Sequence, residues 1–466
     1  MLKYSKSSRR KFLQQIGSAS LVAAAGPLAS LTAKANAEER ILRYERRFSS
    51  VDAVKIGVIG FGIQGHGDLA AALKVPGVEL AAVCDLYTGR LQNAKELYGD
   101  AILTTKNYQE VLDRKDIDAV IIATSDNWHA RITRDALKKG KHVYCEKPMV
   151  HKISEGMGVV EAYRASKKIL QVGSQRVSGL TCAKAQELLK AGDIGKLNMV
   201  NAINDRQSAI GAWEYTMPSD ASPETVDWNK YIEGINKISF DPKKFFWWRN
   251  YKDFGTGVAG DLFVHLLSGT HFITGSTGPN KIFAGGQLSY WKDGRDVPDV
   301  MSGIMQYPES TMHPAFTLSL QVNFVSGTGG QEHTILVGDE GVMEIRGNGL
   351  TVKHSIMPKA PGFGGYDAVM TYPKEMQESL AQTYNAKYSA EDKAKPIKAD
   401  TIFTVPAGYS EHLDHITKFF DNVRTGTPAV EDAVFGFRAA APALACNDSY
   451  FQKKIISWDP DGMKLK

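Results

Sequence analysis

Cysteine is scarce in this sequence, since its 466 residues contain only Cys84, Cys145, Cys182 and Cys446. These four are widely spaced and form no C-x-x-C pair, so neither a zinc site nor a disulfide framework is indicated. Cys84 and Cys145 stand in apolar runs, which favours buried free thiols. No other pattern in the chain predicts a metal site, and we expect none.

An excess of charge of one sign is also missing once the N-terminus is set aside. The chain has 56 Lys and Arg residues against 51 Asp and Glu, a formal charge of +5. Six of the basic residues lie in residues 1–37, which contain no acid, and without them 50 basic residues face 51 acidic ones. The rest of the chain therefore lacks the electrostatic footprint of a protein that binds nucleic acid or anionic membrane.

Residues 1–37 have the order of an export signal. Arg9 and Arg10 precede Phe-Leu, a weakly apolar stretch runs to about residue 31, and small residues follow up to Ala37. That stretch is too short and too rich in small residues for a stable membrane span. The paired arginines resemble the twin-arginine signal, which carries folded proteins across the bacterial inner membrane. We expect a periplasmic or otherwise exported protein; a disordered basic N-terminus is the alternative.

From residue 54 onward, short apolar runs alternate with helix-like segments. Continuous apolar strands between helices predict a doubly wound parallel sheet, covered by helices on both faces. We expect this Rossmann domain to span residues 50–175. The expected strands are 54–59, 78–85, 101–103, 119–123, 142–146 and 169–172, and the expected helices are 65–73, 89–97, 108–112, 128–139 and 153–166.

Beyond residue 175 strand candidates follow one another without helices of matching number. This indicates an α+β domain over residues 176–466 with a large, mostly antiparallel open sheet. Residues 358–400, rich in Lys, Ala, Pro and Gly, are expected to be an insertion over the surface, and residues 410–451 to hold closing helices. The strand candidates are 197–205, 286–291, 316–324, 333–337 and 342–346.

The strongest local motif is a glycine-rich loop directly after the first expected strand. It reads Gly60-Phe61-Gly62-Ile63-Gln64-Gly65 and leads into a helix. Small residues permit a tight turn and a close approach of pyrophosphate to the backbone, and a helix N-terminus favours the phosphate charge. Asp85, at the end of the next strand, would bind the adenosine ribose and repel a 2′-phosphate. NAD is thus the expected cofactor, with NADP less favoured; the alternative is a glycine cluster in an unrelated α/β domain.

Polar residues follow two further strands of this domain. Thr124, Asn127 and His129 come after one strand, and Glu146 and Lys147 after the next. Ligands of open α/β sheets bind outside the carboxyl ends of the strands, so these residues should border the cofactor. Lys147 would lie near the nicotinamide, where its ammonium can hydrogen-bond a reacting hydroxyl and exchange a proton with it. A solvated surface lysine is the alternative.

Two segments carry a family resemblance. Residues 141–148, Lys-His-Val-Tyr-Cys-Glu-Lys-Pro, resemble the Glu-Lys-Pro signature of the Gfo/Idh/MocA family, which includes glucose-fructose oxidoreductase and inositol dehydrogenase. Residues 257–265, Gly-Val-Ala-Gly-Asp-Leu-Phe-Val-His, resemble the family's glycine-rich segment before an Asp-x-x-x-His helix. The four-residue spacing places Asp261 and His265 on one helix face.

The resemblance covers most of the mature chain and implies roles for three residues. His265 would be the acid or base at the substrate hydroxyl, Asp261 would position the substrate or orient the imidazole, and Lys147 would complete the proton-handling set. The structural alternative is a helix-capping Asp261 and a packed core His265.

An aromatic segment, residues 245–251, sets the chain apart from the simplest members of that family. Flat rings can bind the apolar faces of sugars, and arginine can clamp hydroxyls or a carboxylate. We therefore expect Trp248, Arg249 and Tyr251 to contact the substrate. An aromatic core cluster is an equally good interpretation.

Together these features predict an NAD-dependent oxidoreductase that acts on a secondary hydroxyl of a sugar or glycoside. An exported enzyme has no obvious pool that regenerates NAD, so the cofactor should be tightly held and restored within each cycle. The runner-up is a redox-neutral, NAD-dependent glycoside hydrolase that oxidises, eliminates, adds water and reduces. A non-catalytic sugar-binding protein is the third hypothesis. An open sheet needs its outer face covered, so we expect a homo-oligomer through that face.

Overall fold

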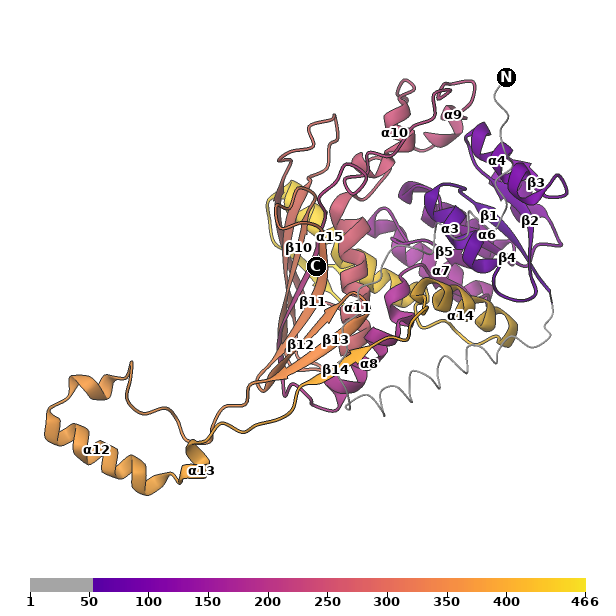
Figure 1. Ribbon diagram of the computed structural model, residues 1–466. Coiled ribbons are helices and arrows are strands. Elements are labelled where there is room, and N and C mark those ends of the chain that lie inside the picture. The colour runs from indigo at the N-terminus through magenta and orange to yellow at the C-terminus, as the bar shows by residue number, and fades with distance from the viewer. Residues whose placement is uncertain (1–52) are drawn as a thin grey trace, which may run out of the picture.

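The computed structural model describes residues 53–466, and the expected export signal lies outside them. A six-stranded sheet and a ten-stranded sheet organise the described chain (Figure 1). Among residues 53–466, none of the helices combines the length and the apolar character that a membrane crossing requires.

The six strands of the first sheet are all parallel and lie in the order β3-β2-β1-β4-β5-β6. The predicted doubly wound fold is confirmed, and the crevice between β1 and β4, where the order reverses, is where ligands of such sheets bind. The third strand begins two residues later than expected, because Leu103–Thr105 is the part that pairs with β2. The strands are β1 (Val54–Ile59), β2 (Val78–Cys84), β3 (Leu103–Thr105), β4 (Ala119–Ile122), β5 (His142–Cys145) and β6 (Leu170–Val172).

Helices bury both faces of this sheet, as the continuous apolar strands required. Ile56 and Ile121 pack in one cluster with α3 and α14, whereas Val120 and Ile122 pack in another with α5 and α6. One expected closing helix, α14, thus returns from the far end of the chain to cover the Rossmann sheet (Figure 1). The helices are α3 (Ile63–Ala72), α4 (Thr88–Tyr98), α5 (Tyr108–Asp113), α6 (Asp126–Lys138), α7 (Gly156–Ser166) and α14 (Glu411–Thr425).

The ten-stranded sheet is antiparallel except where β7 and β10 pair in parallel. This confirms a large, mostly antiparallel second sheet. Its strands are β7 (Leu197–Asp205), β8 (Lys281–Gln287), β9 (Val300–Tyr307), β10 (Phe316–Asn323), β11 (Gln331–Gly338), β12 (Gly341–Arg346), β13 (Gly349–His354), β14 (Thr401–Thr404), β15 (Ile456–Asp459) and β16 (Lys464–Leu465).

The strand predicted at residues 286–291 is wrong in position. The sheet strand β8 ends at Gln287, and the chain then turns because the carboxylate of Asp299 accepts hydrogen bonds from the N–H groups of residues 289–291 at 2.6–2.9 Å. The adjoining β9 was not predicted, because Gly303 occupies a buried position and Ile304 an outward one, which weakens the apolar alternation.

Three helices cover the inner face of the second sheet. They are α8 (Leu180–Lys190), α11 (Val264–Thr274) and α15 (Ala433–Gln452). The longest, α15, packs against β8 and α11, and also reaches the Rossmann domain, where a Cβ on Gly156 would lie 2.0 Å from the ring of Phe437. This contact between α7 and α15 helps to set how the second sheet faces the Rossmann strands.

The long connection between β7 and α11 runs over the carboxyl ends of the Rossmann strands. Tyr87, after β2, forms an isolated bridge with Val226 in this connection. Two short helices, α9 (Trp228–Tyr231) and α10 (Pro242–Phe246), hold the aromatic rings of a separate buried cluster. This connection therefore roofs the crevice between β1 and β4.

An arm between β13 and β14, residues 355–400, projects far from the body of the molecule (Figure 1). It includes the segment expected as an insertion and carries α12 (Lys374–Lys387) and α13 (Ala390–Lys393), neither of which has a buried residue. Phe363 stacks on Tyr384 with ring centroids 4.9 Å apart. A helix this short is marginal in water without a packed face.

Candidate active site

The glycine-rich loop joins β1 to α3 through positions that accept only glycine. Gly60 has a φ of 91°, and a Cβ there would lie 2.5 Å from the backbone of Ala123. A Cβ on Gly65 would lie 2.0 Å from the carbonyl oxygen of Gly60. Both contacts are with backbone, which cannot move aside. The first turn of α3 contains no acidic residue, so its N-terminus suits a phosphate.

Asp85 lies beside this loop, just after β2. Its Oδ2 accepts a hydrogen bond from the backbone N–H of Phe61 at 2.8 Å, and its Oδ1 accepts one from that of Tyr87 at 2.9 Å. Arg90 of α4 pairs with the same carboxylate at 3.3 Å. Sequence reasoning missed Arg90, whose only signal was its position five residues after Asp85.

A groove runs from the loop along the Rossmann strand ends, and its opposite wall is the aromatic connection. Rings from that connection, including Phe245, Phe246 and Trp248, line it. Most of the residues predicted to bind the cofactor line it as well. These are Gly60, Gly62, Ile63, Gln64, Asp85, Thr124, His129, Glu146 and Lys147.

Three of the predicted cofactor residues do not line the groove. The ring of Phe61 is buried and stacks on His66 at 3.7 Å between centroids. Gly65 is buried against Gly60, and the side-chain oxygen of Asn127 accepts a hydrogen bond from the hydroxyl of Ser125 at 2.7 Å. These residues shape the loop and the strand end rather than presenting side chains to a ligand.

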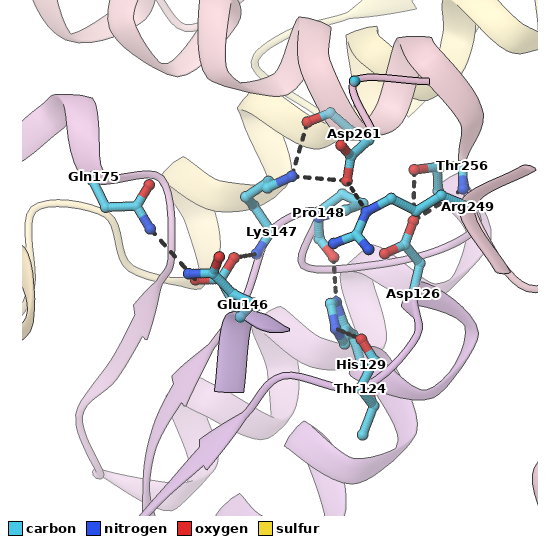
Figure 2. Close-up of polar contacts among 12 residues, drawn as sticks. Thr124, Asp126, His129, Glu146, Lys147, Pro148, Gln175, Arg249, Thr256 and Asp261 are labelled. Carbon is cyan, nitrogen blue, oxygen red and sulfur yellow. Dashed lines mark hydrogen bonds and ion pairs between the residues drawn. The ribbon is translucent and has the colours of Figure 1, made fainter. Parts of the chain in front are cut away.

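Two buried side chains tie the wall of the groove together (Figure 2). The ring of His129 bridges the carbonyl oxygens of Pro148 at 2.8 Å and Thr124 at 3.2 Å. Asp126 accepts hydrogen bonds from the N–H and the hydroxyl of Thr256 at 2.9 and 2.7 Å. They hold two strand ends and the second domain in register.

Lys147 is fixed by Asp261 from the second domain (Figure 2). Its Nζ donates hydrogen bonds to Oδ1 of Asp261 at 2.8 Å and to the carbonyl oxygen of the same residue at 2.9 Å. Burial alone would raise the pKa of Asp261, but the attraction of Lys147 and Arg249 outweighs it, and the pKa lies below its ordinary value. Asp261 is therefore an ionised, buried carboxylate that holds an ammonium at the wall of the site.

The helical turn that carries Asp261 is irregular. Residues Ala259–Phe263 form a π-helical turn directly before α11, a distortion that recurs at functional sites. The guanidinium Nε of Arg249 donates to the same Oδ1 of Asp261 at 3.1 Å. One carboxylate thus serves two cations.

His265 lies four residues after Asp261 and lines a second hollow, the cavity, together with Lys147 and Asp261. Within residues 53–466 no hydrogen bond of its ring to another protein group is present. Burial, followed by the nearby charges of Lys147 and Arg176, lowers the pKa of His265 well below its ordinary value. The imidazole is neutral at physiological pH and can accept a proton.

Glu146, directly before Lys147, is a buried carboxyl group. Burial and then the nearby Asp68 raise the pKa of Glu146 well above its ordinary value. Its Oε2 accepts a hydrogen bond from the N–H of Lys147 at 3.2 Å, and its Oε1 accepts one from Gln175 at 3.4 Å (Figure 2). We therefore assign Glu146 to the shape of this turn rather than to proton acceptance.

The three residues predicted to contact the substrate are separated in the structure. Trp248 and Arg249 line the groove, with the guanidinium carbon 4.2 Å from the ring centroid, and Arg249 also lines the cavity. Tyr251 instead is buried in the aromatic cluster around α9 and α10. That prediction is corrected, because neither hollow is bordered by Tyr251.

Sequence reasoning missed most of the residues that line the cavity. Their segments carry no shared motif, and they meet only through folding. They are Gln175, Arg176, Asn204, Arg206, Trp213, Tyr215, Leu262, Glu332 and Glu411.

The described residues offer no obvious metal site. Over residues 53–466, no three His, Cys, Asp or Glu side chains are grouped so as to hold a metal ion. All four cysteines are free and buried, as expected.

Comparison with known proteins identifies the N-terminal domain. Residues 54–174 match the Gfo/Idh/MocA family, described as an oxidoreductase family with an NAD-binding Rossmann fold. The inositol 2-dehydrogenase of Salmonella typhimurium is 32% identical over 167 residues, which are 35% of this chain and 49% of that protein. A glycosyl hydrolase family 109 protein of Shewanella baltica is 30% identical over 174 residues, 34% of this chain and 38% of that protein. The chain thus spans about half or less of the curated relatives it matches.

Solved structures extend the likeness of fold to both domains. A levoglucosan dehydrogenase in complex with NADH and levoglucosan superposes with a TM-score of 0.60 at 17% identity, covering 87% of this chain and 99% of that one. An aldose-aldose oxidoreductase from Caulobacter crescentus gives 0.61 at 14% identity with the same coverage, 87% and 99%. At such identities the likeness shows the two-domain fold alone.

Proposed function

We propose that this protein is an NAD-dependent oxidoreductase that acts on a secondary hydroxyl of a sugar or glycoside. One observation carries the proposal: Lys147, Asp261 and His265 line one cavity, and Lys147 also lines the groove beside the glycine-rich loop. A substrate in the cavity would therefore border a dinucleotide in the groove at Lys147. The match of residues 54–174 to an oxidoreductase family supports the same assignment.

The groove has the features that a dinucleotide needs. Gly60 and Gly65 allow the tight turn, and the N-terminus of α3 faces the loop without an acidic residue in its first turn. Asp85 stands where the adenosine ribose would bind. When bound, NAD supplies the hydride acceptor.

The chain's own residues handle the proton of the substrate hydroxyl. His265, neutral because burial and nearby cations lower its pKa, accepts that proton. The ammonium of Lys147 donates a hydrogen bond to the oxygen as negative charge develops there. Asp261 keeps this ammonium in place through its hydrogen bond of 2.8 Å.

The same geometry favours NAD over NADP. The Asp85 carboxylate would repel a 2′-phosphate, although Arg90 lies 3.3 Å from it and offers a counter-charge. Both Asp85 oxygens are held by backbone N–H groups, so the carboxylate cannot turn away. Titration with NADH and NADPH, followed by nicotinamide fluorescence, tests this preference.

Export through a twin-arginine signal, with the cofactor carried along tightly bound, is part of the proposal. Arg9, Arg10 and the apolar stretch after them support it. Cell fractionation of the full chain, beside a variant with both arginines changed to lysine, tests it. Retention of wild-type protein in the cytoplasm would argue against export.

Redox-neutral glycoside hydrolysis is the second candidate. The Shewanella baltica relative, a glycosyl hydrolase family 109 protein at 30% identity over 174 residues, favours it. The proton-handling groups at Lys147 and His265 suit a transient ketone and the loss of its neighbouring proton as well as simple oxidation.

A spectrum of the purified protein, before and after adding sugars and nitrophenyl glycosides, separates these functions. Oxidation of a sugar raises the absorbance of reduced nicotinamide. Glycoside hydrolysis releases nitrophenol without lasting reduction, and a sugar-binding protein does neither. Absence of any bound or bindable dinucleotide would reject the whole proposal.

We also propose that the protein is a homo-oligomer through the outer face of the ten-stranded sheet. Phe283 and Ile304 are paired across β8 and β9 and are 47% and 50% exposed, and Met199 on β7 is 42% exposed. The arm adds a second unpacked apolar surface, with Met376 51% and Leu380 38% exposed along one side of α12. A second copy of this chain is the partner that we propose for both apolar surfaces, the outer face of the sheet and the side of α12. A monomer in light scattering at micromolar concentration would overturn this.

A further inference from the structure

The cavity beside Lys147 is lined by charged side chains of both signs. A neutral sugar needs only hydrogen-bonding groups in its binding site. Charged side chains of the cavity that have no partner of opposite sign would instead indicate a charged substrate. The cations are Lys147, Arg176, Arg206 and Arg249, and the carboxyl groups are Glu146, Asp261, Glu332 and Glu411.

Three of the four carboxyl groups are not available as counter-ions for a further cation. Asp261 is shared by Lys147 and Arg249, at 2.8 and 3.1 Å. Glu332 forms an ion pair with Arg176. Burial raises the pKa of Glu146 well above its ordinary value, which disfavours its anionic form.

Glu411, the fourth, is the first residue of α14. Burial raises the pKa of Glu411, and the nearby Arg176 opposes that rise. It faces a cation that Glu332 already pairs with. Glu411 is therefore not a counter-ion for the remaining arginine.

Arg206, directly after β7, is that remaining cation. Its Nη1 donates a hydrogen bond to the carbonyl oxygen of Gly211 at 2.9 Å, and its guanidinium carbon lies 5.4 Å from the ring centroid of Phe324. Throughout residues 53–466 it forms no ion pair with a carboxylate. Its charge nevertheless acts on the reacting groups, since it contributes to lowering the pKa of both Asp261 and His265.

Arg249 adds further donors on the same cavity. Only its Nε is engaged, by Asp261, and its two terminal nitrogens form no hydrogen bond with another group in the described part of the chain. Its face is held against Trp248 at 4.2 Å, which fixes the plane of the guanidinium. A planar, oriented guanidinium suits an anion with two oxygens.

We propose that the substrate is an acidic sugar, whose anionic group pairs with Arg206 and with the free edge of Arg249. A guanidinium without a counter-ion loses part of its hydration in a partly closed cavity, and this loss costs free energy. An anion that pairs with the guanidinium offsets more of that cost than a neutral hydroxyl does. The inference rests on the proposed function, because it takes the cavity as the substrate site. The anion is a carboxylate, as in a uronic acid, or a sulfate or phosphate ester.

Calorimetric titration of the NAD-saturated protein tests this directly. Glucuronate, galacturonate, glucose 6-sulfate and glucose 6-phosphate are compared with glucose and galactose, at low and at high ionic strength. At least one acidic sugar should bind about tenfold more tightly than its neutral counterpart. That advantage should shrink with added salt. The inference is overturned if glucose or galactose binds as tightly as every acidic sugar.

The R206Q variant locates the effect. It should weaken binding of the preferred acidic sugar by about tenfold and leave a neutral sugar within about twofold. R164Q makes the same charge change at an exposed position on α7 and should alter neither. Equal weakening of acidic and neutral sugars by R206Q would overturn the inference. If R206Q fails to fold, the comparison of sugars on the wild-type protein decides alone.

Failure of this inference is distinguishable from failure of the proposed function. If neutral sugars alone bind and reduce the bound nicotinamide, the enzyme is an oxidoreductase and the acidic substrate is rejected. If acidic sugars bind and R206Q weakens that binding, but none of them reduces the nicotinamide, the cavity is assigned correctly and the oxidation is rejected.

Discussion

The groove and the cavity meet at Lys147 but are built differently. One wall of the groove is shaped by backbone from residues close in sequence, with Gly60 and Gly65 at the loop and Asp85 at the next strand end, and the aromatic connection forms the other wall. The cavity is lined by charged side chains from segments far apart, such as Arg206 after β7 and His265 on α11. Binding in the groove should therefore depend on the free space beside the loop, and binding in the cavity should depend on its charges. A single methyl group should damage the first, and a single lost charge the second.

Removing the ammonium at the junction should have the largest effect. Lys147→Met is expected to lower turnover about a thousandfold, because it removes the donor that stabilises the developing alkoxide. NADH affinity should stay within a fewfold, since the glycine loop is untouched. Stopped-flow reduction of bound nicotinamide and NADH fluorescence measure the two. Lys152→Met, at an exposed lysine nearby, is the control. Turnover of Lys147→Met within tenfold of wild type would contradict the assigned role.

Loss of His265, the proposed proton acceptor, should come next. His265→Asn is expected to lower kcat/KM about a hundredfold. In the wild type, kcat/KM should not fall as pH drops through 6.5, the ordinary value for histidine, because the pKa of His265 is lowered and its neutral form persists to more acid pH. An acid limb centred near 6.5 that is lost in His265→Asn would show that the pKa of His265 is not lowered. A kcat/KM of His265→Asn within tenfold of wild type would show that this histidine is not the acceptor.

The space limit on the groove predicts a third effect. Gly65→Ala should weaken NADH binding about tenfold or more and destabilise the fold by about 1–3 kcal/mol, because its Cβ would lie 2.0 Å from the Gly60 carbonyl oxygen. Gly67→Ala, two residues on in α3, is the matched control, with its nearest neighbour at 3.8 Å. Thermal melts and fluorescence titration check both. Equal NADH affinity and equal stability of the two variants would show that space at Gly65 does not limit binding in the groove.

A smaller, selective change is expected at the strand end. Asp85→Ser should shift the NADH-to-NADPH affinity ratio by about tenfold towards NADPH, since Arg90 stays and the repelling carboxylate is gone. Parallel titrations with the two nucleotides measure the ratio. An unchanged ratio would mean that the adenosine ribose does not meet Asp85.

We expect the smallest effect at Tyr251, an aromatic residue that lines neither the groove nor the cavity. Tyr251→Phe should leave KM within about twofold and cost less than about 1 kcal/mol of stability, because the ring stays packed in the cluster around α9 and α10. Burial raises the pKa of Tyr251 to about 12, so its hydroxyl is protonated throughout the usual assay range. Trp248→Ala, in the wall of the groove, serves as the positive comparison. A marked rise in KM for Tyr251→Phe would restore it as a substrate contact.

The sequence predicted the Rossmann half in detail because its signals are local. Continuous apolar strands, the glycine run of residues 60–65 and the acid after the next strand all lie within one stretch of chain. The second sheet was predicted in kind but not in detail. The strand Val300–Tyr307 was not predicted, because Gly303 at a buried position and Ile304 at an exposed one break the alternation of apolar residues in the sequence. The loop before it is set by a single side chain, Asp299.

By itself, the sequence determined the glycine-rich loop and named Lys147, Asp261 and His265 as candidates. The tertiary structure alone decided that Lys147 and Asp261 form one ion pair across 114 residues, that burial raises the pKa of Glu146, and that Tyr251 belongs to a core. It also brought Arg206 into the cavity, where this arginine has no carboxylate partner among residues 53–466. The physical reason is the range of each effect. Backbone turns depend on neighbours in the chain, whereas charge pairing and burial depend on groups that only folding brings together.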